Sequence, residues 1–346
     1  MGPALSRDLE KRGFFSRTRS CCTAMRCSTL KSHGRIVLFL SAVALAAAGE
    51  FPAWAYPVPD PGPAPIPPAE AVLRVPDSPV VLTPRDLAAH GPAVPDWHPA
   101  EHPAMPDIVV RGREPQVWAC AYCHLPSGAG RPENASLAGL SATYIKQQLA
   151  AFKNGERPGA EPRRAPQNFM IALAKAATDE EIAVAANYFA ALRPASFVRV
   201  VEAATVPKTY VAGAMLARVP GGGEEPIGGR IIEVPEELER AEKRDARTTY
   251  VAYVPVGSLQ RGADLALTGG AGKTQVCATC HGPELRGLAD VPRLAGRSPS
   301  YLMRQLYDVR HSARTGPGTV PMQAVVANLT AEDLVALAAY VASREP

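Results

Sequence analysis

The 346-residue sequence predicts a mainly α-helical protein, in which two copies of one small helical domain are joined by an irregular connector with short strands. Three observations support this fold class. Two stretches of sequence match each other at a fixed spacing. Each copy places apolar residues at helical spacing after a serine cap, and strand-like alternation is absent from both copies. A chain of this length has room for two or three domains.

The N-terminal segment predicts a leader for export. An apolar run of 13 residues, Ile36–Ala48, follows basic residues and precedes the small-x-small pattern at 53–55. This order is typical of a secretory signal peptide, so we expect residues 1–55 to be removed and the mature protein to be periplasmic. The run is shorter than the roughly 20 apolar residues of a membrane span. An uncleaved leader that anchors the protein, facing the periplasm, is the alternative.

Removal of this leader changes the charge and the cysteine content. The leader holds eight of the 37 basic and three of the 33 acidic residues, so the net charge falls from +4 to −1. The mature chain has no basic field to indicate nucleic-acid binding. Three of the seven cysteines also leave with the leader, and the other four lie in two Cys-x-x-Cys-His motifs. We therefore expect no disulfide framework.

The internal repeat defines the two predicted domains, at 107–193 and 256–346. Positions 157 residues apart carry the same residue type in Cys120/Cys277, Cys123/Cys280, His124/His281, Tyr144/Tyr301, Gln148/Gln305, Leu149/Leu306 and Arg157/Arg314. Further along the offset falls to 152, which matches Met170 with Met322 and Tyr188 with Tyr340. Thr178 and Glu181 predict a capping box at the start of the last helix of the first copy.

The remaining segments are an arm and a connector. Residues 56–106 are rich in proline and favour an extended tether or a surface-hugging arm, with a helix expected only over Thr83–His90. In the connector, 194–255, the runs "FVRVV", "RIIEV" and "TYVAYV" predict short strands, and "EELERAEKRDAR" predicts a solvated helix. A plain connector and a docking surface for a partner are both compatible with this composition.

Cys-x-x-Cys-His is the attachment motif of c-type haem. Two thiols on one helical turn can add to the two vinyl groups of a haem, and the adjacent histidine then lies under the iron. A thioredoxin-like redox pair would require a βαβ context, and a zinc site would couple the two motifs through four cysteines. Neither alternative explains a histidine directly after each pair.

A second axial ligand can be sought among the methionines after residue 55, which are Met105, Met170, Met215, Met303 and Met322. Only Met170 and Met322 match in the repeat, and both are expected in irregular segments, from which a thioether can reach an iron. Hydrophobic filling is the alternative for this pair. Met303 is expected inside a helix, as a core residue.

With these motifs the chain resembles a two-domain, dihaem class I cytochrome c of the bacterial periplasm. The resemblance covers roughly residues 117–192 and 256–346. It implies two covalently attached haem c groups, one on Cys120 and Cys123 and one on Cys277 and Cys280. It also implies axial ligands to iron, which are His124 and Met170 for the first haem and His281 and Met322 for the second. The stretch before Cys120 departs from the family pattern, because it is a poor helix.

A haem with both axial positions filled passes electrons and offers no open site to a substrate. The sequence therefore favours a relay between a redox protein donor and an acceptor over an enzyme. Two alternative functions remain. The chain could be the electron-accepting subunit of a periplasmic dehydrogenase, or it could be a dihaem enzyme such as a peroxidase or a sulfur-compound dehydrogenase. A periplasmic dehydrogenase or a membrane oxidase is a possible partner.

Arg157 and Arg314 are repeated polar positions with two possible roles. They could lie near haem propionates, where a fixed cation would tune the midpoint potential. They could instead lie at an exposed end of the middle helix of each copy, which the sequence favours.

Overall fold

The computed structural model describes residues 51–60, 71–88 and 91–346, and Gly49–Pro346 form one compact unit. Most of the predicted leader lies outside the described residues. Of the part that is described, Ala53–Ala55 form a 3-10 turn, η1. Within the described ranges no single helix is long and apolar enough to cross a membrane. The helices Pro317–Val326 and Ala331–Ala342 reach that length and apolar composition only when they are taken together, and they are bent by 115° at the break between them.

The first helical region carries α1 (Asp107–Val110), α2 (Cys120–His124), α3 (Ala142–Lys153), α4 (Ala165–Ala176) and α5 (Asp179–Ala191). Ser141 caps α3 by accepting a hydrogen bond from the amide of Tyr144 at 3.0 Å. Thr178 and Glu181 form the capping box predicted for α5. These caps fix where the two long helices of this region begin.

Two local predictions, one in this region and one in the proline-rich arm, are wrong. The stretch before Cys120 contains a short antiparallel pair, β1 (Gly112–Arg113) with β2 (Val117–Trp118), so the first copy is not free of strands. Thr83–His90 is not a helix, because residues 84–87 form turns; residues 89–90 lie outside the described part of the chain. Asp86 accepts hydrogen bonds from both the amide and the hydroxyl of Thr83, and these bonds stabilise a turn.

The proline-rich arm follows the protein surface. Trp97 is only 2% exposed, and its Nε1 donates a hydrogen bond to the carbonyl of Lys243 at 2.8 Å. The buried imidazole of His98 lies 2.9 Å from Asp245. A short bridge joins Leu73 to Leu82. These contacts are those of a surface-hugging arm and not of a free tether.

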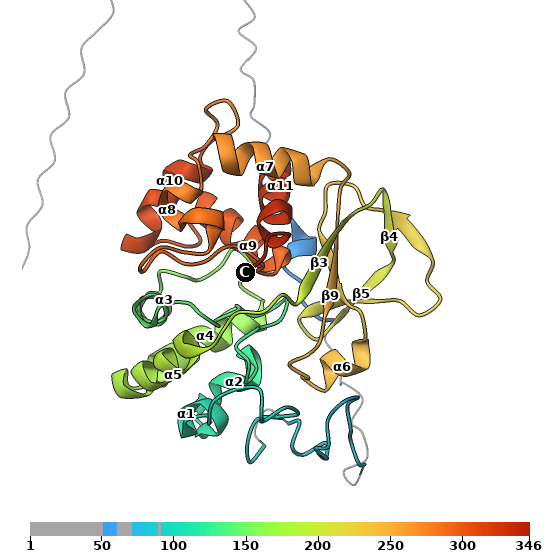
Figure 1. The fold of residues 1–346 in the computed structure, drawn as a ribbon, viewed down its shortest axis with the longest axis vertical. Coiled ribbons are helices and arrows are strands. Elements are labelled where there is room, and N and C mark those ends of the chain that lie inside the picture. Colours follow the sequence, from blue (N-terminus) through green and yellow to red (C-terminus); the bar gives the residue numbers. More distant parts are fainter. Residues whose placement is uncertain (1–50, 61–70, 89–90) are drawn as a thin grey trace, which may run out of the picture. The chain divides into compact units, whose positions relative to one another are not determined.

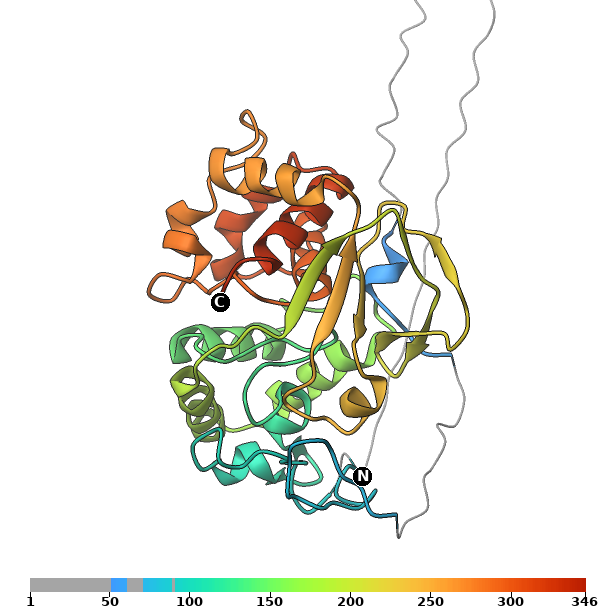
Figure 2. The same ribbon diagram turned by 45° about the vertical axis from the view of Figure 1, so that its right-hand side comes forward.

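The connector is more regular than its sequence predicts. The three strand runs form one sheet in the order β3 (Val198–Glu202), β9 (Tyr250–Val254), β8 (Ile232–Pro235), with β3 and β9 parallel and β8 and β9 antiparallel. Figures 1 and 2 show β3 and β9 side by side. Two further antiparallel pairs join β4 (Thr205–Pro207) to β7 (Glu224–Pro226) and β5 (Thr209–Ala212) to β6 (Met215–Arg218). The predicted solvated helix is a short α6 (Leu238–Glu242) whose Ala241 is buried.

The second helical region contains the long helices α7 (Ser258–Thr268), α9 (Pro299–Arg310) and α11 (Ala331–Ala342). Shorter elements lie between them: α8 (Ala278–His281), η2 (Pro283–Leu285), η3 (Pro317–Thr319) and α10 (Val320–Val326). The helices α7 and α11 cross at Gly262, where a Cβ would lie 2.1 Å from the carbonyl of Ala336 and 2.5 Å from the Cβ of Tyr340. Glycine is required there by the close approach of the two helices.

Each helical region has a hydrophobic core of its own. One core contains Val109, Leu140 and Phe189, and the other contains Leu334 and Met303. Figure 1 draws the first region in green and the second in orange and red. The prediction of a mainly α fold with two helical regions and a connector with short strands is confirmed.

Candidate functional site

The first centre is built on α2, which carries Cys120, Cys123 and His124 within two turns. Nδ1 of His124 lies 2.8 Å from the carbonyl oxygen of Ala135. A nitrogen that donates to a carbonyl carries the ring proton, so Nε2 keeps its lone pair. Burial lowers the pKa of His124, and the charge of Arg297 lowers it further. The imidazole is therefore neutral and suited to bind a metal through Nε2.

The second centre repeats this arrangement. Cys277 precedes α8, and His281 ends it. His281 is 7% exposed, as is His124, and its Nδ1 lies 2.8 Å from the carbonyl oxygen of Pro292. Burial again lowers the pKa of the imidazole. Both centres thus present a half-buried or exposed cysteine pair beside a buried, neutral histidine with a fixed ring.

The two matched methionines lie in helices and not in the irregular segments that the sequence predicts. Met170 belongs to α4 and Met322 to α10. Both helices begin with proline in the first turn, which is a typical signal for a helix start. Met303 is 1% exposed in α9, as expected for a core residue.

The structure brings the four predicted residues of the first centre together. Cys120, Cys123, His124 and Met170 all line one cavity of about 680 Å³, whose other walls are largely apolar. For the second centre, the observation that brings predicted residues together is a shared hydrophobic core and not a shared cavity. Cys277 and Met322 pack against the same hydrophobic core, which is not the core that Cys120 packs against. Cys120 and Cys277 thus pack against different cores, in disagreement with a single four-cysteine zinc site.

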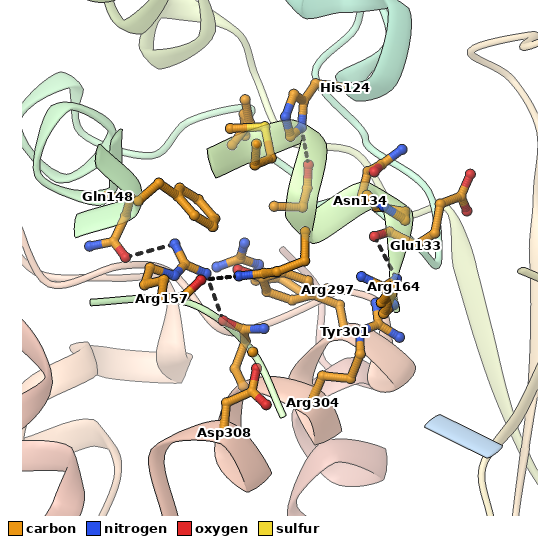
Figure 3. A pocket seen from close by; sticks show the side chains of 18 of the residues that line it. His124, Glu133, Asn134, Gln148, Arg157, Arg164, Arg297, Tyr301, Arg304 and Asp308 are labelled. Carbon is orange, nitrogen blue, oxygen red and sulfur yellow. Dashed lines mark hydrogen bonds between the residues drawn. The ribbon is translucent and has the colours of Figure 1, made fainter. Parts of the chain in front are cut away.

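A second, more polar cavity of about 860 Å³ shares His124 and Met170 with the apolar one. Figure 3 shows His124 and the arginines that line this cavity. Four of its lining residues are arginines that are at most 6% exposed: Arg157, Arg164, Arg297 and Arg304. Among the described residues, the Nε atoms of the first three have no hydrogen-bond partner. Burial lowers the pKa of Arg164 to about 9. The four guanidinium groups outnumber the three carboxylates that also line the cavity, Glu133, Glu161 and Asp308, so the cavity is suited to an anion.

The arginines of the repeat exchange partners across the two helical regions. Arg157 donates to Gln148 at 2.9 Å and to Gln305 at 2.8 Å. Arg314 donates to Gln305 at 3.0 Å and to Gln148 at 2.8 Å. Arg314 also donates to the hydroxyl of Tyr144 at 3.2 Å. The favoured prediction, an exposed helix end, is therefore wrong for Arg157 and Arg314, because each arginine donates a hydrogen bond to a glutamine of the other helical region.

Other polar residues at this contact could not be found from the repeat. Arg304 donates to the carbonyls of Pro132 and Ala55, and Tyr56 donates to Asp308 at 2.7 Å. The repeat equivalent of Arg304 is the uncharged Gln147, so matching the two copies gives no signal there.

Comparison with known proteins identifies the family. The Cytochrome c family matches residues 110–193, and the family described as Cytochrome C oxidase, cbb3-type, subunit III matches residues 265–341. Cytochrome c4 of Azotobacter vinelandii is 37% identical over 227 residues, which are 64% of this chain and 82% of that protein. The chain belongs to the cytochrome c4 family.

Two further similarities accompany this membership. A thiosulfate dehydrogenase electron acceptor of Thiomonas intermedia (strain K12) is 24% identical over 233 residues, which are 66% of this chain and 80% of that one. The solved structure of reduced recombinant cytochrome c4 from Pseudomonas stutzeri has a TM-score of 0.43 and 22% identity, and the match covers 65% of this chain and 93% of that one.

As a member of the cytochrome c4 family, the chain is a dihaem c-type cytochrome and an electron carrier, with two covalently bound haem c groups. The residues present fit this cofactor. A haem has an apolar ring and two carboxylates at one edge. The first centre offers an apolar cavity that shares residues with a cavity lined by four buried arginines, and in three of these the Nε has no hydrogen-bond partner among the described residues. Carboxylates are the partners that a planar guanidinium binds best.

Proposed function

We propose that this cytochrome c4 family member relays electrons between two periplasmic redox partners through two haems with His/Met ligation. The thioether linkages would form at Cys120 and Cys123 in a first domain, 107–193. The observation that carries the proposal is that His124 and Met170 line the same apolar cavity as this cysteine pair. By the repeat, Cys277 and Cys280 in a second domain, 256–346, carry the other haem, with His281 and Met322 as its ligands.

This ligand set decides the kind of chemistry. A thioether opposite an imidazole raises the potential of a haem relative to harder ligands, and the two together fill both axial positions. The hydrogen bonds from His124 and His281 to backbone carbonyls hold each ring in one orientation and one tautomer. The role of the chain's residues would thus be to bind, orient and bury the cofactor.

One partner class has specific support. The relative from Thiomonas intermedia is named as a thiosulfate dehydrogenase electron acceptor, and the match covers 66% of this chain and 80% of that one. We therefore propose a periplasmic dehydrogenase as electron donor, as a second candidate beside a free carrier. Persistent co-purification with a dehydrogenase would favour this subunit role, and a chain that purifies alone and exchanges electrons with several donors would favour the carrier.

We propose that the leader directs the protein to the periplasm but is cleaved before Phe51 and not after Ala55. Tyr56 is 3% exposed and donates to Asp308, and Arg304 donates to the carbonyl of Ala55 at 2.9 Å. Cleavage after Ala55 would leave a charged α-ammonium group at this buried position, which is unfavourable. Residues 46–48 of the sequence offer an equivalent small-x-small pattern, so the bond from Ala48 to Gly49 is the better candidate.

The carrier role is tested by exposing the reduced protein to carbon monoxide. With both axial positions filled by protein ligands, neither haem should form an adduct, and the protein should not turn over peroxide. A carbon monoxide adduct on one of the haems would show an open axial position and would favour an enzyme instead.

A further inference from the structure

The loop that follows each Cys-x-x-Cys-His motif has the same backbone form in both copies of the repeat. The amide of Gly130 donates to the carbonyl of His124 at 3.1 Å, and the amide of Gly287 donates to the carbonyl of His281 at 2.7 Å. Each loop then reaches the carbonyl that holds the imidazole of its own copy. Because the two backbones are equivalent, a difference in exposure between the loops comes from the segments that pack over them.

The two loops differ in exposure. Every residue from 121 to 133 is buried or half-buried, whereas most residues at the equivalent positions, 278–290, are exposed. Arg131 is 6% exposed, and its equivalent Leu288 is 55% exposed. Cys123 is half-buried, and its equivalent Cys280 is exposed. A haem would contact equivalent residues of both loops, so it does not account for this contrast.

The connector covers the motif of the first copy. Nη1 of Arg244 donates to the carbonyl of Tyr122 at 2.8 Å, and its guanidinium lies 3.7 Å from the centre of the Tyr122 ring. Nη2 of Arg131 donates to the sulfur of Met215 in β6 at 3.4 Å. Ala129 packs against a hydrophobic cluster of the connector that includes Met215. The connector is thus fixed to both the motif and the loop of the first copy.

The arm and an aromatic pair add to this cover. The hydroxyl of Tyr122 donates to the carbonyl of Leu87 in the proline-rich arm at 3.4 Å. Trp118 lines the apolar cavity of the first centre, and its ring lies 4.9 Å from the ring of Phe169 in α4. The second copy has no aromatic residue at the positions equivalent to Tyr122, Trp118 and Phe169, which are Thr279, Gln275 and Pro321.

We propose that the connector and the arm close the first haem to redox partners, so that electrons are exchanged with a partner protein through the second haem. The exchange surface is formed by Val276, Thr279, Cys280, Leu288 and Val291. This inference rests on the proposed function as an electron carrier with two haems.

The proposal defines the path of each electron. In one exchange, the partner's cofactor loses one electron and the iron of the second haem gains it, or the reverse, and the second haem then exchanges one electron with the first. Electron tunnelling slows steeply with distance, so a layer of protein over the first motif suppresses direct exchange there. Donor and acceptor would therefore use the same surface in turn, and the first haem would store a second electron.

The exchange surface fits a redox protein with an apolar, weakly charged surface around its cofactor. Its three large apolar side chains are between 36% and 55% exposed. The charged residues of the same loop are engaged within the chain: Arg286 forms an ion pair with Glu284 at 3.2 Å, and Asp290 accepts a hydrogen bond from Ser141 at 2.7 Å. A surface with little net charge does not steer a partner over long distances, so the rate of exchange should depend only weakly on ionic strength.

The first test measures accessibility in the reduced, haem-loaded protein without any substitution. A neutral, soluble gadolinium chelate broadens the NMR signals of protons that lie close to solvent. We expect the signals of the thioether bridge at Cys280 to broaden several-fold more than those at Cys123. Equal broadening, or stronger broadening at Cys123, would overturn the inference.

The second test measures electron exchange with tris(phenanthroline)cobalt(III) as a cationic probe, which takes one electron from the reduced protein and becomes cobalt(II). Leu288→Lys places a positive charge on the exchange surface and should slow this oxidation about three- to tenfold at low ionic strength, because it repels the probe. The matched control is Val184→Lys, at an exposed valine of α5, a helix that lines the cavity of the first centre. It should leave the rate almost unchanged.

An equal or larger effect of Val184→Lys, or no effect of Leu288→Lys, would overturn the inference. The gadolinium measurement needs no variant, so loss of folding in either variant leaves it decisive. Failure of the proposed function itself would be recognised earlier, as a high-spin haem or a missing methionine signal in the unsubstituted protein.

Discussion

Gln148 and Gln305, which occupy equivalent positions in the two copies of the repeat, each accept a hydrogen bond from the arginine of the other copy at 2.8 Å. Each glutamine also accepts from the arginine of its own copy. The same residue types thus serve within a copy and between copies. The two copies of the repeat can therefore pack against each other through side chains that both copies contain.

Loss of one arginine from this set should weaken the contact. Arg157→Ala removes two hydrogen bonds to buried or half-buried amide oxygens, which should lower the free energy of unfolding by about 1–3 kcal/mol. A double-mutant cycle of Arg157→Ala with Gln305→Ala, measured by denaturant unfolding of the holoprotein, should give a coupling energy of about 0.5 kcal/mol or more. Strict additivity of the two substitutions would show that the hydrogen bond contributes nothing.

Met322→Ala should remove the axial ligand of the second haem alone. The weak red methionine-to-iron band should fall by about half, since one of two haems is affected, while the covalent haem content stays at two per chain. Met303→Leu is the matched control, because Met303 is a core residue of the same domain; it should keep the full band. An unchanged band in Met322→Ala would refute the ligand role.

The N-terminus of the exported protein should begin at Gly49. N-terminal sequencing or intact mass determination after periplasmic expression gives the answer directly. Tyr56→Phe should process at the same bond but lose the hydrogen bond to Asp308, with a cost to stability of about 1 kcal/mol. A mature chain that begins at Tyr56 would contradict the proposed cleavage position.

Asp333 should make the second domain sensitive to acid. Although burial acts to raise its pKa, the hydrogen bonds from Thr330, Lys273 and Arg261 outweigh this effect and hold the pKa below its ordinary value of 3.8. A carboxylate with a lowered pKa stabilises the fold above its unfolded-state pKa, and this stability is lost as the pH falls through the folded-state value.

The corresponding substitution is Asp333→Asn, which keeps the capping geometry but removes the charge. It should lower the free energy of unfolding by about 1–2 kcal/mol at pH 7. The difference from the unsubstituted protein should shrink as the pH falls below the ordinary value of 3.8, as denaturation at several pH values would show. A difference that stays constant as the pH falls below this value would contradict the assignment.

The sequence predicted those features that a local signal determines. The Cys-x-x-Cys-His motifs, the serine and threonine caps and the offset of the repeat each lie within a few residues or recur at a fixed spacing. Matching the copies selected Met170, which does line the cavity with His124. It also selects Arg157 and Arg314, although the predicted exposure of these residues is wrong, because the sequence of one helix does not show which residues pack against its end.

Features that depend on packing between distant segments were missed. Arg297 and Arg304 differ from their repeat equivalents, so the comparison of copies that found the methionines could not find them. The order of the connector sheet depends on pairing Val198–Glu202 with Tyr250–Val254, two runs separated by some fifty residues. Neither kind of contact leaves a periodic pattern in the sequence.

The visible spectrum of the oxidised and reduced protein, with quantification of haem, tests the central claim most directly. We predict two covalently bound haems per chain, both low-spin, with the red methionine-to-iron band in the oxidised form. A high-spin signal from either haem, or a band that accounts for only one of the two, would contradict an electron relay through two His/Met-ligated centres.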